Sequence, residues 1–124
     1  MSAPATHGPQ DATGTGVRVC LCTCPDLAGA EALAVALVED GLAACVKLLP
    51  GVLSVYRWDG RTERAQEVQL IMKTTVERLP ALMDQVRASH PYACPELIAL
   101  EAVAGLPGYL DWVRDHCART DTGP

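Results

Sequence analysis

The sequence predicts an α+β fold with the element order βαββαβ and one further helix at the C-terminal end. Three observations predict this fold. Two long runs of alternating apolar residues meet at Asp59-Gly60, which predicts a β-hairpin. A strand-type pattern and a helix-type pattern flank each arm of the hairpin. The 124 residues are also 49% hydrophobic and 20% charged, a composition that supports one buried core in a single domain.

The first strand is predicted at residues 17–24, a continuous apolar run that ends at Pro25-Asp26. Asp26 suits the N-cap of the next helix, because its carboxylate can accept a hydrogen bond from a free backbone N–H group. Gly41 stands where a left-handed residue commonly ends a helix. The helix between them has one apolar face at helical spacing, formed by Ala30, Leu33, Ala34, Leu37 and Val38.

The central hairpin is the strongest short-range signal in the chain, because Asp-Gly between alternating apolar flanks forms a two-residue turn. A turn at Asp59-Gly60 sets the register of the two arms. The expected pairs are Trp58 with Arg61, Tyr56 with Glu63, Ser54 with Ala65 and Val52 with Glu67. Pro50-Gly51 predicts a bulge or bend, since proline cannot donate to a strand ladder. Each arm can exceed ten residues, about twice the usual strand length, so the tip should project beyond the domain.

A second helix is predicted after the hairpin, with Thr75 as its cap and Pro80 in its first turn. Its apolar face comprises Val76, Leu79, Leu82, Met83 and Val86. His90-Pro91 ends the helix, because the residue before a proline avoids helical backbone angles. Residues 96–103 then form the fourth strand, and residues 106–117 form a final helix.

This order matches a ferredoxin-like βαββαβ sandwich with a long central hairpin and an extra C-terminal helix. The first strand should lie between the third and the fourth. Two helices should cover one face of the sheet and leave the other to solvent or to a neighbouring subunit, so we expect an oligomer. We assign residues 17–119 to this domain, residues 1–16 to a disordered extension and residues 120–124 to a flexible tail.

Composition excludes several classes of protein. The net charge of -5 argues against a nucleic-acid partner, which needs a basic surface. No apolar run approaches the roughly 18 residues of a membrane span, and the N-terminal residues do not resemble a signal peptide. We therefore expect a cytoplasmic protein that does not bind membranes, whose crowded Cys20, Cys22 and Cys24 remain thiols. No phosphate loop, metalloprotease histidine pair or nucleophile elbow is present, so no enzymatic activity is predicted.

Five motifs resemble one family in order along the chain. They are CTCPD at 22–26, GLAACVKLLPGVLSVYRWDG at 41–60, EVQLIMKTT at 67–75, HPYACPELIAL at 90–100 and GLPGYLDWV at 105–113. Together they resemble the CutA family of divalent-cation tolerance proteins. The resemblance implies a ferredoxin-like subunit, a tight homotrimer joined by its hairpins, a PII-like architecture and tolerance to copper and other divalent metal ions. It attaches no enzymatic activity, and it implies a cytoplasmic protein.

The resemblance also implies a copper site. The family ligands are the cysteine of the Cys-Thr motif, here Cys22, and two consecutive histidines before Pro-Tyr. Of these two, only His90 is present, because Ser89 stands where the family has the first histidine. Copper is the expected metal, with other divalent cations as alternatives. His90 could instead contact the last carbonyl groups of its helix as a cation.

The cysteines of the first strand allow two interpretations. Cys20, Cys22 and Cys24 share one strand face, where successive Cα atoms stand about 6.6 Å apart. In a straight strand this spacing disfavours joint capture of one ion, and buried hydrophobic thiols are the alternative. If capture occurs, soft thiolates favour Cu(I). A helix start beside Cys24 also predicts a lowered thiol pKa.

A second group of residues could line a ligand-binding cleft between subunits. It comprises Glu67, Lys73, Tyr92, Glu96 and Trp112. The alternative function is a PII-like trimeric signalling or scaffold protein that binds a small ligand in these clefts. The same residues could instead form an interface network of ion pairs and hydrogen bonds. Trp58 at the hairpin tip is expected to anchor the trimer.

Overall fold

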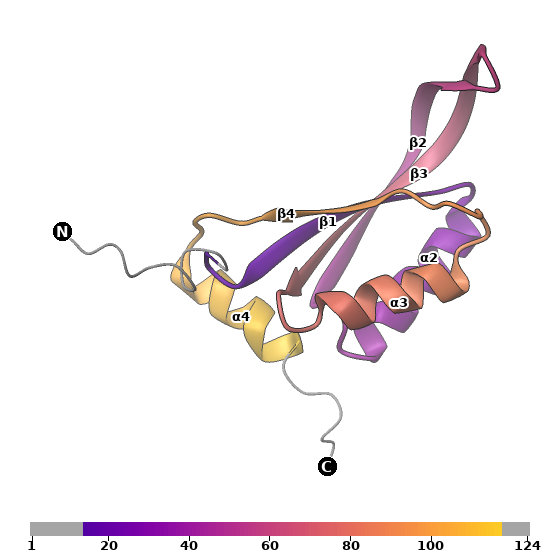
Figure 1. The fold of residues 1–124 in the computed structure, drawn as a ribbon. Coiled ribbons are helices and arrows are strands. Elements are labelled where there is room, and N and C mark those ends of the chain that lie inside the picture. The colour runs from indigo at the N-terminus through magenta and orange to yellow at the C-terminus, as the bar shows by residue number, and fades with distance from the viewer. Residues whose placement is uncertain (1–13, 118–124) are drawn as a thin grey trace.

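The computed structural model describes residues 14–117 as an antiparallel four-stranded sheet packed against helices (Figure 1). The elements are β1 (Val17–Cys24), α2 (Leu27–Glu39), β2 (Cys45–Trp58), β3 (Arg61–Thr75), α3 (Leu79–Ser89), β4 (Leu97–Glu101) and α4 (Pro107–Cys117). The predicted α+β class, the element order and the C-terminal helix are confirmed.

The sheet has the strand order β2-β3-β1-β4, which confirms that the first strand lies between the third and the fourth. Cys22 of β1 is opposite Leu70 of β3 on one side and Leu97 of β4 on the other. Figure 1 shows α2 and α3 on the same side of the sheet. The end of β1 therefore lies in the centre of the sheet and under helices.

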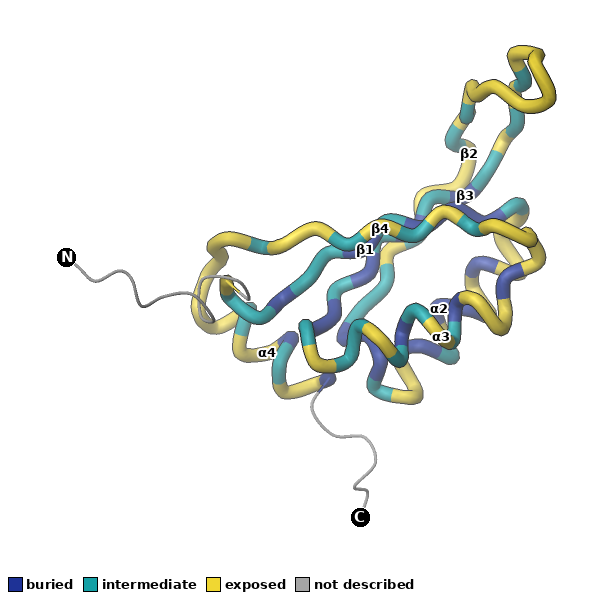
Figure 2. The backbone as a smooth tube through the Cα atoms, in the orientation of Figure 1, coloured by how far each residue is buried: buried dark blue, intermediate teal, exposed yellow. Residues whose placement is uncertain are grey.

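The hairpin of β2 and β3 has the predicted turn and register. Asp59 and Gly60 have φ values of 56° and 79°, and Trp58 is opposite Arg61. The register shifts between Leu49 and Val52, which confirms the bulge at Pro50-Gly51. The hairpin extends well beyond the helices in Figure 1, and Figure 2 shows that its tip is exposed.

The main core lies between the sheet and the two helices α2 and α3. Side chains alternate along a strand, so every second residue of β1 and β3 points to this core. Its members include Cys20, Cys22, Val68, Leu70 and Met72 from the strands, Ala30, Leu33 and Leu37 from α2, and Leu82 and Val86 from α3. A smaller core, to which α4 contributes, contains Val17, Ala44, Val113 and Cys117.

The first helix has the predicted ends. The Asp26 carboxylate accepts a hydrogen bond of 2.7 Å from the backbone N–H of Gly29, and Asp26 has extended backbone angles. Gly41 has φ 71°, the left-handed conformation expected after the helix. The cap at Asp26 also sets the direction in which the chain leaves Cys24 at the end of β1.

The second helix begins later than predicted. It starts at Leu79, its cap residue is Arg78, and no side chain caps it. The expectation that Thr75 caps this helix is therefore wrong. Thr75 is the last residue of β3, where it pairs with Val17, and its hydroxyl accepts a hydrogen bond of 3.3 Å from the N–H of Arg78 in the turn before the helix. β4 is also shorter than the predicted strand at residues 96–103.

Residues 14–16, which we assigned to the extension, contact the domain. The Thr15 hydroxyl donates to the carbonyl of Ala102 at 2.6 Å, and Arg114 donates to the carbonyl of Thr15 at 2.6 Å. The rest of the predicted extension and the predicted tail lie outside the described residues. Among residues 14–117, no helix combines the length and hydrophobicity that crossing a membrane requires.

Candidate functional site

Three buried side chains with metal-ligating groups meet at the end of β1. The sulfur atoms of Cys22 and Cys24 and a ring nitrogen of His90 all lie within 4.8 Å of one another. The Cys24 sulfur lies 3.7 Å from Nε2 of His90. Cys24 ends β1 and His90 directly follows α3, so the sheet and the helix together position the three groups.

The convergence of Cys22 and Cys24 differs from the straight-strand expectation. Both residues belong to β1, so the strand does not end between them. Their rotamers instead bring the two sulfur atoms together, although their Cα atoms stand two residues apart on the strand. Cys20 shares the same buried face but is not part of the group.

Hydrogen bonds to its neighbours determine the tautomer of His90. The backbone N–H of Tyr92 can only donate, and it donates to Nδ1 of His90 at 3.1 Å. The proton of the neutral ring is therefore on Nε2, which donates to the carbonyl oxygen of Thr23 at 2.7 Å. The alternative interpretation, in which the ring contacts the last carbonyl groups of its own helix, is wrong, because Nε2 donates to Thr23 of β1.

Burial raises the pKa of the thiols near this site. It raises the pKa of Cys22 to about 12, and the neighbouring Cys24 thiol adds to the effect. Burial also raises the pKa of Cys24, and the nearby Asp26 carboxylate raises it further. The predicted lowering by the helix start is therefore wrong, because loss of hydration outweighs it. Both thiols are protonated at neutral pH.

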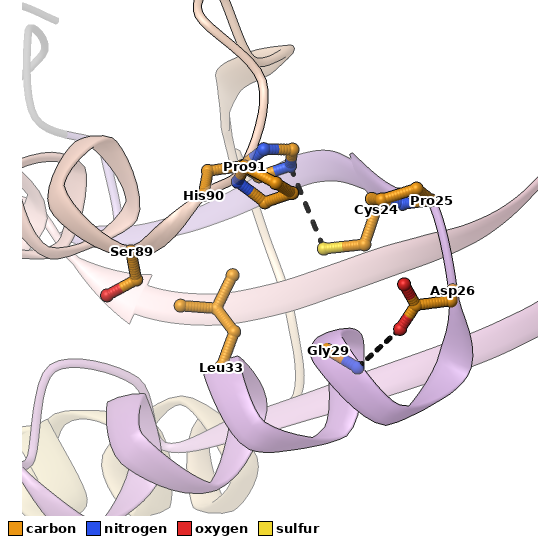
Figure 3. A pocket seen from close by; sticks show the side chains of 8 residues that line it. All are labelled: Cys24, Pro25, Asp26, Gly29, Leu33, Ser89, His90 and Pro91. Atoms are coloured by element: carbon orange, nitrogen blue, oxygen red, sulfur yellow. Dashed lines mark hydrogen bonds between the residues drawn. The ribbon is translucent and has the colours of Figure 1, made fainter.

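A small cavity leads to Cys24 and His90 (Figure 3). Its volume is about 60 Å³, and it lies between the start of α2 and the end of α3. The lining residues are Cys24, Pro25, Asp26, Gly29, Leu33, Ser89, His90 and Pro91. Figure 3 shows the Cys24 sulfur directed at the His90 ring across this cavity. An ion of atomic size can therefore approach the two groups from the outside.

A larger groove brings together three of the five cleft candidates. Glu67, Tyr92 and Glu96 line a groove of about 850 Å³ with residues of the hairpin and the loop before β4. The Tyr92 hydroxyl donates to Glu67 at 2.7 Å, and the Thr23 hydroxyl donates to Glu96 at 2.9 Å. The hydrogen bond to Glu67 raises the pKa of Tyr92 to about 12.

Lys73 and Trp112 lie apart from this groove, so one subunit does not unite the five predicted residues. Lys73 contacts Tyr109 of α4, with its ammonium nitrogen 3.5 Å from the phenol oxygen. Trp112 stacks on the same Tyr109 at 5.7 Å between ring centroids. Sequence reasoning missed Tyr109, and its position on a predicted helix gave no signal for contact with Lys73.

Comparison with known proteins identifies the relatives of this chain. Residues 18–116 match the family model described as CutA1 divalent ion tolerance protein. The divalent-cation tolerance protein CutA of Thermus thermophilus is 46% identical over 99 residues, which are 80% of this chain and 96% of that protein. All three residues of the buried group lie inside the matched segment.

Solved structures have the same fold. The crystal structure of CutA from Xylella fastidiosa superposes with a TM-score of 0.80 at 44% identity, over 82% of this chain and 98% of that one. The protein of Archaeoglobus fulgidus described as a periplasmic divalent cation tolerance protein CutA superposes with a TM-score of 0.79 at 36% identity. That match also covers 82% of this chain and 98% of the other.

Proposed function

The chain belongs to the CutA1 family of divalent ion tolerance proteins, and from this premise we propose that it binds copper or another divalent metal ion at Cys22 and His90. The observation that carries the proposal is the convergence of these side chains from two distant parts of the chain. Thiolate and imidazole groups are the usual ligands of copper and zinc in proteins. Sequestration of such an ion would contribute to metal tolerance.

The proposed role is binding and not catalysis. The family is named for tolerance, and the proposed ligands are buried, with Cys22 fully inaccessible to solvent. A buried ion with few open coordination positions suits storage or sensing better than turnover. Copper is the first candidate for the cofactor and other divalent cations are the second.

We propose that the working form is a homotrimer. Support comes from large apolar side chains that one subunit leaves exposed on the hairpin and on β4. They include Leu53, Val55, Trp58, Ile98 and Leu100. A projecting two-stranded hairpin is also only marginally stable alone in water, so a partner would stabilise it. Light scattering at micromolar concentration tests this assembly, and a monomer mass would contradict it.

We place the protein in the cytoplasm, because its free thiols suit a reducing compartment. The Archaeoglobus relative is described as periplasmic, so the compartment needs its own test. Cell fractionation with an antibody to the untagged protein would supply it. Recovery in the periplasmic fraction would contradict the cytoplasmic assignment.

Metal titration tests the binding role. The reduced protein is titrated with Cu(I) or Zn²⁺ against a competing chelator, beside the variants Cys22→Ala and His90→Ala. We expect one ion per subunit in the wild type and weaker binding in both variants. Wild-type protein that never competes with the chelator would refute the proposal.

A second candidate function is a PII-like signalling or scaffold protein that binds a small ligand. One observation supports it, namely the groove beside Glu67, Tyr92 and Glu96, whose volume is in the range of small-molecule sites. The comparisons favour the tolerance role. A thermal-shift screen of metabolites would test the groove, and a hit abolished by Glu96→Gln would favour this second function.

A further inference from the structure

The group at the end of β1 contains a second sulfur atom that the resemblance does not assign. The resemblance implies a site of one cysteine and two histidines, and in this chain Ser89 stands in the place of the first histidine. Cys24 lies in the same buried group as Cys22 and His90, with all ligand atoms within 4.8 Å of one another. The chain therefore offers three donors although one family ligand is missing.

The distances suit coordination of one ion. Bonds of about 2.3 Å to sulfur and about 2.0 Å to nitrogen, at tetrahedral to trigonal angles, hold the two atoms about 3.5–3.7 Å apart. The Cys24 sulfur and Nε2 of His90 are 3.7 Å apart. Two metal–sulfur bonds likewise reach across about 4.6 Å at most. The Cys22 and Cys24 sulfur atoms lie within 4.8 Å of one another.

The hydrogen bonds of His90 show why a second sulfur matters. Nε2 donates to Thr23, and Nδ1 accepts from Tyr92, so both ring nitrogens are already engaged. A neutral ring can bind an ion through Nε2 only after its proton moves to Nδ1, which costs the bond from Tyr92. A thiol binds an ion by losing its own proton, so the two sulfur atoms add donors that do not depend on a change of the ring tautomer.

We propose, on the premise of the metal-binding function above, that Cys24 is the second sulfur ligand of this site and that the bound ion is thiophilic. Cys22 and Cys24 each form one metal–sulfur bond, and each thiol proton passes to the solvent buffer as its bond forms. Two thiolates balance the charge of a divalent ion, so the buried complex with neutral His90 has no net charge. Hard cations such as Mg²⁺ prefer oxygen ligands and are excluded.

The route to the ligands agrees with this assignment. The cavity of about 60 Å³ opens onto Cys24 and His90, whereas Cys22 is not among its lining residues. Figure 3 shows the Cys24 sulfur directed at the His90 ring. An entering ion therefore meets Cys24 before it reaches Cys22. Cys24 is then both the entry ligand and a permanent one.

The test compares three single alanine variants in a Cys94→Ser background, which removes an exposed thiol. The variants are Cys22→Ala, Cys24→Ala and Cys20→Ala. Cys20 is the matched control, because it is buried on the same face of the same strand but lies outside the group. The probes are Cd²⁺ and Cu(I), with Mg²⁺ as the hard cation. Readouts are competition against a chelator and the ultraviolet sulfur-to-cadmium charge-transfer absorption.

We expect Cys24→Ala to weaken Cd²⁺ and Cu(I) binding more than the about 10–100-fold that loss of an outer-shell partner costs. The charge-transfer absorption of the cadmium form should fall by about half, since one of two sulfur bonds is lost. Cys20→Ala should bind like the parent protein, and Mg²⁺ should not compete. Circular dichroism of the metal-free variants checks that each one folds, and Cys24→Ser repeats the test if the alanine variant does not.

Two results would overturn the inference in different ways. If Cys24→Ala binds like Cys20→Ala while Cys22→Ala loses binding, Cys24 is not a ligand and the proposed function stands. If the parent protein binds neither Cd²⁺ nor Cu(I), the proposed function itself fails. Displacement of Cd²⁺ by Mg²⁺ would refute the thiophilic assignment alone.

Discussion

His90 donates its Nε2 proton to the carbonyl oxygen of Thr23 over 2.7 Å, across 67 positions of the sequence. The bond joins the end of α3 to the end of β1 and leaves both groups buried. The tautomer of the His90 ring follows from a second hydrogen bond, in which the N–H of Tyr92 donates to Nδ1. His90 is therefore a structural residue as well as a proposed metal ligand.

His90→Ala should lower the free energy of unfolding of the metal-free protein by about 1–3 kcal/mol, because the buried carbonyl of Thr23 loses its partner. Urea denaturation in the presence of a chelator measures this change. His116→Ala is the control, since His116 is exposed and contacts Trp112 of its own helix. A loss no larger than that of the control would contradict the structural role.

The tautomer itself can be observed. Long-range ¹⁵N–¹H correlation spectra of the metal-free protein should show the His90 proton on Nε2 and an unprotonated, hydrogen-bonded Nδ1. The reason is that a backbone N–H occupies Nδ1. A proton on Nδ1 would show that the loop after α3 takes another conformation in solution.

Gly60→Ala should destabilise the protein by roughly 1–2 kcal/mol, because Gly60 has φ 79° and a Cβ atom disfavours this conformation. An added Cβ meets nothing within 4 Å, so crowding does not contribute. Gly108→Ala is the matched control, since that Cβ also has open space but lies in helix α4. The control should be neutral or stabilising by up to about 1 kcal/mol. Equal urea midpoints for the two variants would contradict the turn assignment.

Trp58→Ala should weaken the proposed trimer and leave the subunit fold intact. Trp58 is 69% exposed at the hairpin tip, so its side chain gains little from burial within one chain. Val35→Ala is the control, because Val35 is also exposed but lies on the helix α2. Sedimentation over a dilution series should show subunit dissociation at higher concentration for Trp58→Ala than for the control. Identical behaviour of the two variants would argue against Trp58 as an anchor.

Glu67→Gln should lower the pKa of Tyr92 from about 12 towards the ordinary phenol value of about 10. The sign follows from charge: the Glu67 carboxylate accepts a hydrogen bond from the neutral phenol and repels the phenolate, so its removal eases ionisation. Carbon-13 spectra of labelled tyrosine rings across alkaline pH measure the pKa. Tyr92→Phe assigns the resonance. An unchanged pKa in Glu67→Gln would show that the bond is absent in solution.

Local signals explain which parts of the fold were predictable. The turn at Asp59-Gly60 and the cap at Asp26 depend on residues within three positions of each other, and both are confirmed. The bulge at Pro50-Gly51 is also local, because proline cannot pair. Thr75 was wrongly predicted to cap the second helix, because the local sequence does not distinguish a cap residue from the last residue of a strand. Pairing with Val17, 58 positions earlier, decided its role.

The candidate site was predictable only in part. The resemblance indicated Cys22 and His90 as ligands, and the structure brings their side chains together. The argument from straight-strand geometry disfavoured Cys24 as a ligand of the same ion. That argument compared Cα positions, but ligand atoms lie at the ends of side chains whose rotamers depend on packing. For the same reason Glu67, Tyr92 and Glu96 meet at one groove, while Lys73 and Trp112 pack on Tyr109.

The sequence by itself determined the order of elements and the hairpin register, because turn chemistry and side-chain periodicity act over a few residues. Only the tertiary structure decided which thiols converge, how the His90 ring is protonated and why the thiols of the site remain neutral. Those properties depend on side-chain packing, on contacts of His90 with Thr23 and Cys24 across 66 or more positions, and on the exclusion of water, which no local pattern records.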